Sequence, residues 1–274
     1  MRRIEGQLAD QEKLAEQVLS WILCARRPLS TLELQHSLAA EPNDTELHGD
    51  SLPQIEDMVS VCAGLVTIDE ESSIIRLVHY TAQEYFLRTQ DYWFPTAEVD
   101  IYTTCVTYLS FRRFEVGPCA TDKRFEQRLQ DNPLYEYSAR NWGHHAREAS
   151  ILLKKVPGFL NGKNLVEAAN QALLATKLWT NHLNYSQEYP MKTTGTHIAA
   201  YFGLLPVVRE LIRTELRSDA KDTFGRTPLS WAAENGYEAV VELLLKNGAE
   251  IETADIEYGQ TPLSLAAENA VKQS

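Results

Sequence analysis

An internal repeat near the C-terminus constrains the fold of this 274-residue chain more than any other feature of its sequence. Residues 227–236 read TPLSWAAENG, and residues 261–269, 34 positions later, read TPLSLAAEN. A weaker copy at residues 194–203 begins 33 positions before the first of these. A fixed period of this length is typical of proteins that stack one small helical unit on the next. The sequence therefore predicts a repeat array over residues 191–274, with two full copies and a truncated third.

Each copy contains the residues that begin and end two short helices. Thr227 can accept a hydrogen bond from the first turn of a helix, and Pro228 occupies the first helical position, where its missing N–H costs nothing. Val240 and Leu244 lie on one face of a second helix. Gly248 then supplies the left-handed residue that commonly ends a helix. These local signals predict a helix–turn–helix unit.

The copies resemble the ankyrin repeat, which has a period of 33 and a T-P-L-H-x-A core. Three departures stand out: Gly195 replaces the usual proline, residues 215–216 lack the helix-ending glycine, and the third copy stops at Ser274 with no second helix. We therefore expect a truncated array whose terminal helix frays, with Leu263 and Leu265 partly uncovered. The resemblance implies an ankyrin α-solenoid with a ligand-recognition surface on its turns and first helices. The protein-interaction candidates there are Asp222, Thr223, Phe224, His197, Trp231, Glu234, Asn235, Tyr237, Asp255, Ile256, Glu257 and Tyr258. Trp231 is equally well interpreted as a packing residue between repeats.

The N-terminal region, residues 1–95, has the element order of a winged helix. Residues 14–25 carry a helical apolar stripe, and residues 30–33 (STLE) form a capping box that opens a second helix. A third helix follows residues 51–54, and two β-prone runs at 65–68 and 74–78 predict a hairpin. A further capping box at residues 81–84 (TAQE) predicts the start of a fourth helix.

Two segments here carry a more specific resemblance. The stretches RPLSTLELQHSLA and IIRLVHYTAQEYF look like the winged helix that follows the NACHT domain in fungal NACHT–ankyrin proteins, and like the GPI inositol-deacylase winged helix. TTCVTYLSF and NPLYEYSARNWGHHARE, within a mainly helical region at residues 96–190, resemble the helical connector of the same proteins. The resemblance implies a signal-transduction fragment, and the four widely spaced cysteines predict a cytoplasmic location. Its winged helix would pack against a NACHT domain, for which these residues contain no counterpart.

Charge argues against a nucleic-acid partner. The chain has a formal net charge of −12, and residues 1–90 contain 7 basic against 15 acidic side chains. A winged helix that reads DNA needs a basic recognition helix, because phosphate contacts dominate the affinity. No apolar run is long enough to cross a bilayer, so we expect no membrane partner either.

No motif predicts catalysis, a cofactor or a metal. Residues 158–164 (GFLNGKN) have one residue too few for a phosphate-binding loop and are expected to form a solvated loop. His144 and His145 are adjacent, so on a helix they cannot face one ion, and both are expected to pack or lie at the surface. His79 is expected to buttress a strand–helix corner, since no nucleophile motif accompanies it. The four cysteines are widely spaced and are expected to be buried free thiols.

The sequence as a whole predicts a mainly α protein and a non-catalytic protein–protein interaction and regulatory module. Two alternatives remain open at this point. One is a DNA-associated winged-helix regulator, and the other is an accessory segment of a lipid-linked hydrolase.

Overall fold

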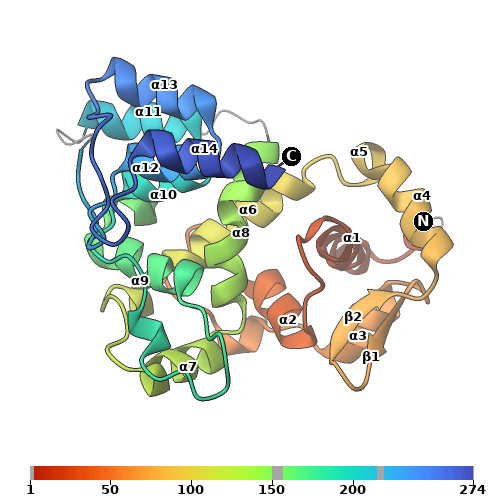
Figure 1. Cartoon of the computed structure of the whole chain (residues 1–274). Coiled ribbons are helices and arrows are strands. Elements are labelled where there is room, and N and C mark those ends of the chain that lie inside the picture. Colours follow the sequence, from red (N-terminus) through yellow and green to blue (C-terminus); the bar gives the residue numbers. More distant parts are fainter. Residues whose placement is uncertain (1–2, 150–156, 215–218, 274) are drawn as a thin grey trace.

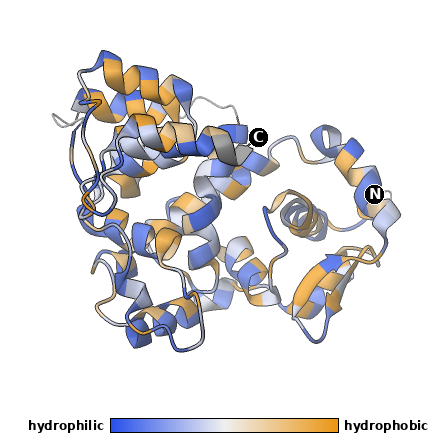
Figure 2. Cartoon of the chain, viewed as in Figure 1, coloured by the Kyte–Doolittle hydropathy of each residue, from blue (hydrophilic) through white to orange (hydrophobic). Residues whose placement is uncertain are grey.

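A computed structural model describes residues 3–149, 157–214 and 219–273 of the chain (Figure 1). The protein is mainly helical, with 58% helix and two strands among these residues. Its apolar core extends from the N-terminal helices through the middle of the chain into the repeats. Hydrophobic residues concentrate on the strands and the repeat helices, whereas the connecting loops are largely hydrophilic (Figure 2).

The N-terminal elements follow the predicted winged-helix order. Ser30 caps its helix as expected: its hydroxyl accepts the Glu33 N–H at 3.2 Å, and the Glu33 carboxylate accepts the Ser30 N–H at 2.8 Å. The two strands are antiparallel, with Val66 opposite Leu77. The elements are α1 (Ala9–Cys24), α2 (Thr31–Ala39), η1 (Gly49–Ser51), α3 (Ile55–Val61), β1 (Val66–Asp69), β2 (Ile74–Leu77), α4 (Tyr80–Arg88) and α5 (Gln90–Trp93).

The predictions made for the corner after the hairpin are wrong. Helix α4 begins at Tyr80, so Thr81 lies inside its first turn and does not cap it. The first turn closes before Thr81 because the His79 carbonyl already accepts the Ala82 N–H at 3.0 Å. The Val78 N–H bonds to the Leu65 carbonyl at 2.9 Å, which ends the hairpin immediately before the helix. His79 occupies the cap position with an exposed side chain and no side-chain cap bond, so it does not buttress the corner.

The middle of the chain is helical, as predicted, and connects the two ends. Helix α6 packs along α8, while α1 contacts α6 and α2 contacts α8. The side chains of Ile101 and Cys105 on α6 are fully buried. His145 is buried on α8 and His144 packs its ring against Phe202. The elements are α6 (Ala97–Leu109), η2 (Arg112–Phe114), α7 (Asp122–Asp131), α8 (Leu134–Glu148), η3 (Gly158–Asn161), α9 (Lys163–Leu174) and η4 (Tyr185–Gln187).

Residues 158–164 are not the solvated loop that we expected. They form the 3₁₀ helix η3 and the start of α9, and the side chains of Phe159 and Leu160 lie in the core. Phe159 packs edge-on against Trp142 of α8, with ring centroids 5.1 Å apart. This burial is what holds the segment against α8.

The repeats form two layers of helices, drawn from green-teal (α10) through cyan to blue (α14) in Figure 1. The first helices pack in the order α10, α12, α14, and the second helix α11 packs on α13. Thr227 and Pro228 begin α12 as predicted, and Gly248 has a φ of +86° just after α13. The bounds are α10 (Gly195–Tyr201), α11 (Leu205–Thr214), α12 (Pro228–Glu234), α13 (Glu238–Lys246) and α14 (Pro262–Gln273). The departure at residues 215–216 lies outside the described residues.

Two glycines explain how the repeats join the connector. A Cβ on Gly195 would lie 2.5 Å from the Leu160 carbonyl oxygen, so the usual proline of the motif would clash with η3. A Cβ on Gly143 of α8 would lie 2.1 Å from the Phe202 ring at the end of α10. Both positions therefore need glycine for close approach.

All four cysteines are buried and free, which confirms the expectation of buried free thiols.

Candidate protein-interaction surface

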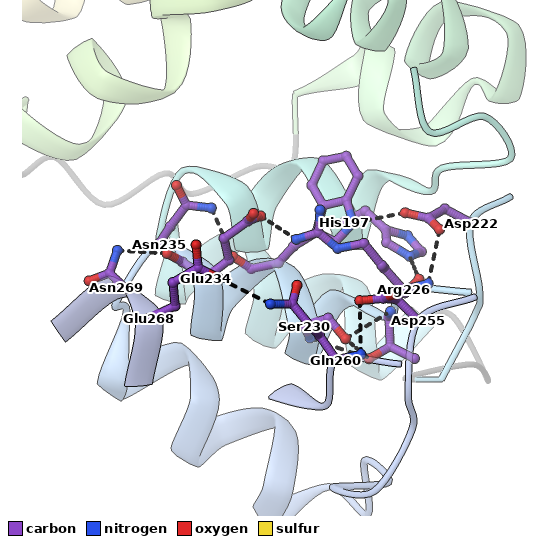
Figure 3. Close-up of polar contacts among 12 residues, drawn as sticks. His197, Asp222, Arg226, Ser230, Glu234, Asn235, Asp255, Gln260, Glu268 and Asn269 are labelled. Carbon is purple, nitrogen blue, oxygen red and sulfur yellow. Dashed lines mark hydrogen bonds and ion pairs between the residues drawn. The ribbon is translucent and has the colours of Figure 1, made fainter. Parts of the chain in front are cut away.

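The turn before α12 is organised by the carboxylate of Asp222. Its Oδ1 accepts the N–H groups of Phe224 at 2.8 Å and Arg226 at 2.9 Å, while its Oδ2 accepts the indole N–H of Trp231 at 3.0 Å. Burial raises the pKa of Asp222, and these hydrogen bonds oppose the rise by favouring the carboxylate. Asp222 thus ties the turn to the helix that follows it (Figure 3).

Asp255 repeats this arrangement one unit later. Its carboxylate accepts the N–H of Tyr258 at 2.7 Å and that of Gln260 at 3.2 Å. Successive turns are also joined to each other, because the Ile256 N–H donates to the Phe224 carbonyl at 2.8 Å. The Thr223 N–H likewise donates to the Met191 carbonyl at 2.8 Å. The turns therefore form one row with a fixed backbone.

His197 of α10 joins the first copy to the second. Its Nε2 lies 3.2 Å from the Arg226 carbonyl oxygen, which can only accept, so Nε2 carries the proton. Its Nδ1 is then the acceptor for the Thr194 N–H, at 3.1 Å. Burial lowers the pKa of His197 to about 4, while backbone acceptors at Arg226 and Ala220 oppose this. The ring is neutral at pH 7 and lies against Trp231, with ring centroids 5.5 Å apart.

Polar contacts repeat along the first helices as well. Arg226 forms an ion pair with Glu234, and Gln260, one unit later, donates to the carboxylate of Glu268 at 3.1 Å. The side-chain amide of Asn269 donates to the Glu234 carbonyl at 2.6 Å, which connects α14 to α12. Equivalent polar contacts thus occur in successive repeats along the face drawn in Figure 3.

The candidate residues separate into three groups by position. Asp222, Trp231 and Asp255 are buried and hold the repeat together, so Trp231 takes the packing role that was one of its two interpretations, and none of the three side chains lies at the surface. His197 is buried too. Those that are half-buried are Thr223, Phe224, Glu234, Asn235 and Tyr237, and those that are exposed are Ile256, Glu257 and Tyr258.

Tyr237 is occupied by the connector. Its hydroxyl accepts a hydrogen bond from Arg147 of α8, whose guanidinium also lies 5.2 Å from the centre of its ring. Its repeat neighbour Gly203 has a φ of +70°, and a Cβ there would lie 2.5 Å from the Tyr237 ring. Tyr237 therefore helps to seat the repeats on α8.

An apolar groove of about 370 Å³ lies between α13 and α14. Leu263 lines it and is 69% exposed, whereas Leu229, its counterpart in the preceding unit, is 1% exposed. The expectation for Leu263 is thus confirmed, but Leu265 is buried and that part was wrong. Val241, Leu245 and Ile251 complete the apolar wall.

Within the described ranges, no group of three or more His, Cys, Asp or Glu side chains is placed to hold a metal ion. No helix in the same part of the chain is both long and apolar enough to traverse a membrane.

The fold and this face together define a winged-helix protein with helical repeats, and comparison with known families describes both parts. Residues 4–93 match the family model of the GPI inositol-deacylase winged helix domain. Residues 164–255 and 196–273 match the model of ankyrin repeats in three copies. The comparison with curated proteins found no match. The chain thus contains a GPI-inositol-deacylase-like winged helix and ankyrin repeats, and ankyrin repeats suggest protein–protein interaction.

The ankyrin match begins within α9, upstream of residue 191. Leu165 precedes Ala168 and Ala169 at the spacing by which Leu229 precedes two alanines in α12. Both alanines of α9 are buried, and α9 packs against α10. The leucine–alanine spacing is the sequence signal that could have revealed this degenerate unit.

Proposed function

We propose that this chain is a non-catalytic protein-interaction and regulatory module whose partner docks on the row of turns. One observation carries the proposal: Ile256 is 77% exposed and Tyr258 is 74% exposed on a turn whose backbone is held from both sides. The Asp255 carboxylate holds the turn from within, and the bond from Ile256 to Phe224 holds it from the preceding turn.

A fixed apolar turn suits protein binding for a thermodynamic reason. Ordering a loop at an interface costs free energy, so a turn that is already ordered retains more of its contact energy. Tyrosine is enriched among residues that dominate interface energies. Glu257 lies between the two apolar side chains and adds a charge that would select for a basic group on the partner.

We further propose the organisation that this role needs. Residues 1–95 would form the winged-helix domain, 96–190 the connector and 191–274 the beginning of an ankyrin solenoid. The winged helix carries exposed apolar side chains at Leu32, Val78, Tyr80 and Leu87, which support a docking face for a second domain. The resemblance noted above makes a NACHT-type domain of a fungal, cytoplasmic signalling protein the candidate for that domain.

Two alternatives have different support. The winged-helix match to GPI inositol-deacylase supports an accessory segment of a lipid-linked hydrolase. In that case the repeats would keep the same proposed docking surface. A DNA-associated role has less support. Helix α3 precedes the hairpin, which is the place of a recognition helix, but it carries Glu56 and Asp57 and no basic residue. A gel shift with mixed duplexes at physiological salt should show no complex, and selective nanomolar binding would favour this alternative.

The docking proposal is tested by comparing partners of matched variants. The double variant Ile256→Ser, Tyr258→Ser removes the exposed apolar pair but leaves Asp255 in place. The control is Leu183→Ser, a similarly exposed apolar residue of the connector. Proteins crosslinked to the wild-type chain should be lost with the double variant and retained with the control. An unchanged set of partners with the double variant would show that the row of turns is not the docking site.

A further inference from the structure

A pocket of about 640 Å³ opens in the connector beside η2 and α7 (α7 is at the lower left of Figure 1). Three arginines contribute to its wall: Arg113 from η2, and Arg124 and Arg128 from α7. The chain as a whole carries a formal net charge of −12. The three guanidiniums therefore form a local concentration of positive charge on an acidic protein.

Within the described residues, the hydrogen bonds of these guanidiniums are with neutral groups. Among the described residues, none of the three forms an ion pair with a carboxylate, although eight other Arg and Lys side chains do. Arg113 donates to the Asn132 side-chain oxygen at 2.8 Å, and Arg128 donates to the Gly117 carbonyl at 2.9 Å. A guanidinium has five N–H donors in a fixed fork, so these bonds position the groups and leave donors for a ligand.

The pocket retains a positive charge after its one acid is counted. Asp131 also lines the wall, and its Oδ1 accepts a hydrogen bond from Gln127 at 2.8 Å. Three cations and one anion leave a local charge of about +2. The positive charge of the arginines also acts on Cys119 in the same wall. Burial raises the pKa of this thiol, and the charges of Arg128 and Arg124 oppose the rise.

Apolar surface lies next to the charges. Phe114, Val116 and Pro118 line the same pocket, and Val116 is 76% exposed. The Arg128 guanidinium lies 5.8 Å from the centre of the Phe114 ring, which places charged and apolar surfaces side by side. A ligand that uses both must combine an anion with an apolar group.

We propose that this pocket binds the phosphate group of a small-molecule phosphate monoester whose organic part is apolar. A phosphate monoester carries about −1.5 to −2 charge at pH 7, which matches the local charge of the pocket. The guanidinium fork fits phosphate oxygens in pairs, which lysines would not do. A volume of about 640 Å³ lies in the range of small-molecule sites.

The test uses calorimetry on the full chain at low salt, with phenyl phosphate as the probe. Phenyl phosphate should bind more tightly than inorganic phosphate, which lacks the apolar group, and than phenyl sulfate, which carries one charge. Arg124→Gln should weaken binding by about tenfold or more, the usual effect of losing a charge-assisted contact. Arg112→Gln is the matched control, because Arg112 is the exposed neighbour of Arg113 and does not line the pocket.

Three results would overturn the proposal. The first is no binding of phenyl phosphate at millimolar concentration. The second is equal weakening by Arg124→Gln and Arg112→Gln, which would indicate general charge attraction instead of a site. The third is a phosphotyrosyl peptide that binds far more tightly than phenyl phosphate, since the ligand would then be a protein segment. Unchanged circular dichroism melting of both variants ensures that lost binding reflects the pocket.

Discussion

Lowering the pH from about 7.5 to about 5 should destabilise the repeats through His197. Burial lowers the pKa of this ring from 6.5 to about 4 in the folded chain, whereas unfolding returns it to its ordinary value. Between these two values the unfolded state binds a proton that the folded state does not. The contribution of His197 to stability is therefore complete above pH 6.5 and is lost as the pH falls towards 4.

The size of the effect follows from the shift. The full difference corresponds to about 3 kcal/mol, and the part lost between about pH 7.5 and pH 5 is about 2 kcal/mol. The main physical cause is burial, which deprives the protonated ring of water, and the hydrogen bond at Nδ1 acts in the same direction. That nitrogen now accepts the Thr194 N–H at 3.1 Å, and protonation would set two donors against each other.

Urea unfolding followed by circular dichroism measures this effect directly. His197→Asn should be less stable than the wild type at pH 7.5, and the gap should shrink by about 2 kcal/mol at pH 5 because the variant does not titrate there. Contributions from the other histidines occur in both proteins and cancel. His79→Asn, the same replacement at an exposed position, is the control for exchanging a histidine for an asparagine. A gap that stays constant with pH, or a His197 ring that titrates near 6.5 by NMR, would refute the reasoning.

Three further outcomes follow from named contacts. Gly195→Pro should lower the melting temperature although proline is usual there, because its Cβ would lie 2.5 Å from the Leu160 carbonyl oxygen; a rise would show that η3 yields easily. Trp231→Phe should cost about 1–3 kcal/mol in urea unfolding, because Asp222 loses the indole donor at 3.0 Å; a cost below about 0.5 kcal/mol would contradict its structural role. Hydrogen exchange should be faster in α14 than in β2, since Leu263 is 69% exposed, and equal protection would disprove the expected fraying.

Much of the fold could be predicted because its signals are local. The capping box at Ser30, the proline at the start of α12 and the left-handed Gly248 each act within a few residues of the backbone. The period of the repeat then places one unit against the next without knowledge of distant contacts. The capping signal at Thr81 was misleading, because the His79 carbonyl already closes the first turn of α4 directly after the hairpin.

The surface was less predictable because exposure depends on segments far apart in the chain. Asp222 and Trp231 look like recognition residues in sequence, yet both are buried and the Trp231 indole N–H donates to the Asp222 carboxylate. Tyr237 belongs to the same motif and is occupied by Arg147, which lies 90 residues earlier. No spacing rule within the repeat reveals that contact.

The sequence by itself determined that the C-terminal part of this chain stacks helical units and that a hairpin follows three helices near its start. It did so because capping, left-handed turns and hydrophobic periodicity depend on neighbouring residues. Only the tertiary structure decided that His197 is held neutral, that Gly195 must lack a side chain, and that Arg113 joins Arg124 and Arg128 around one pocket. Each of these depends on which distant groups exclude water from a site or approach it closely, and burial and electrostatic interaction are set by that packing.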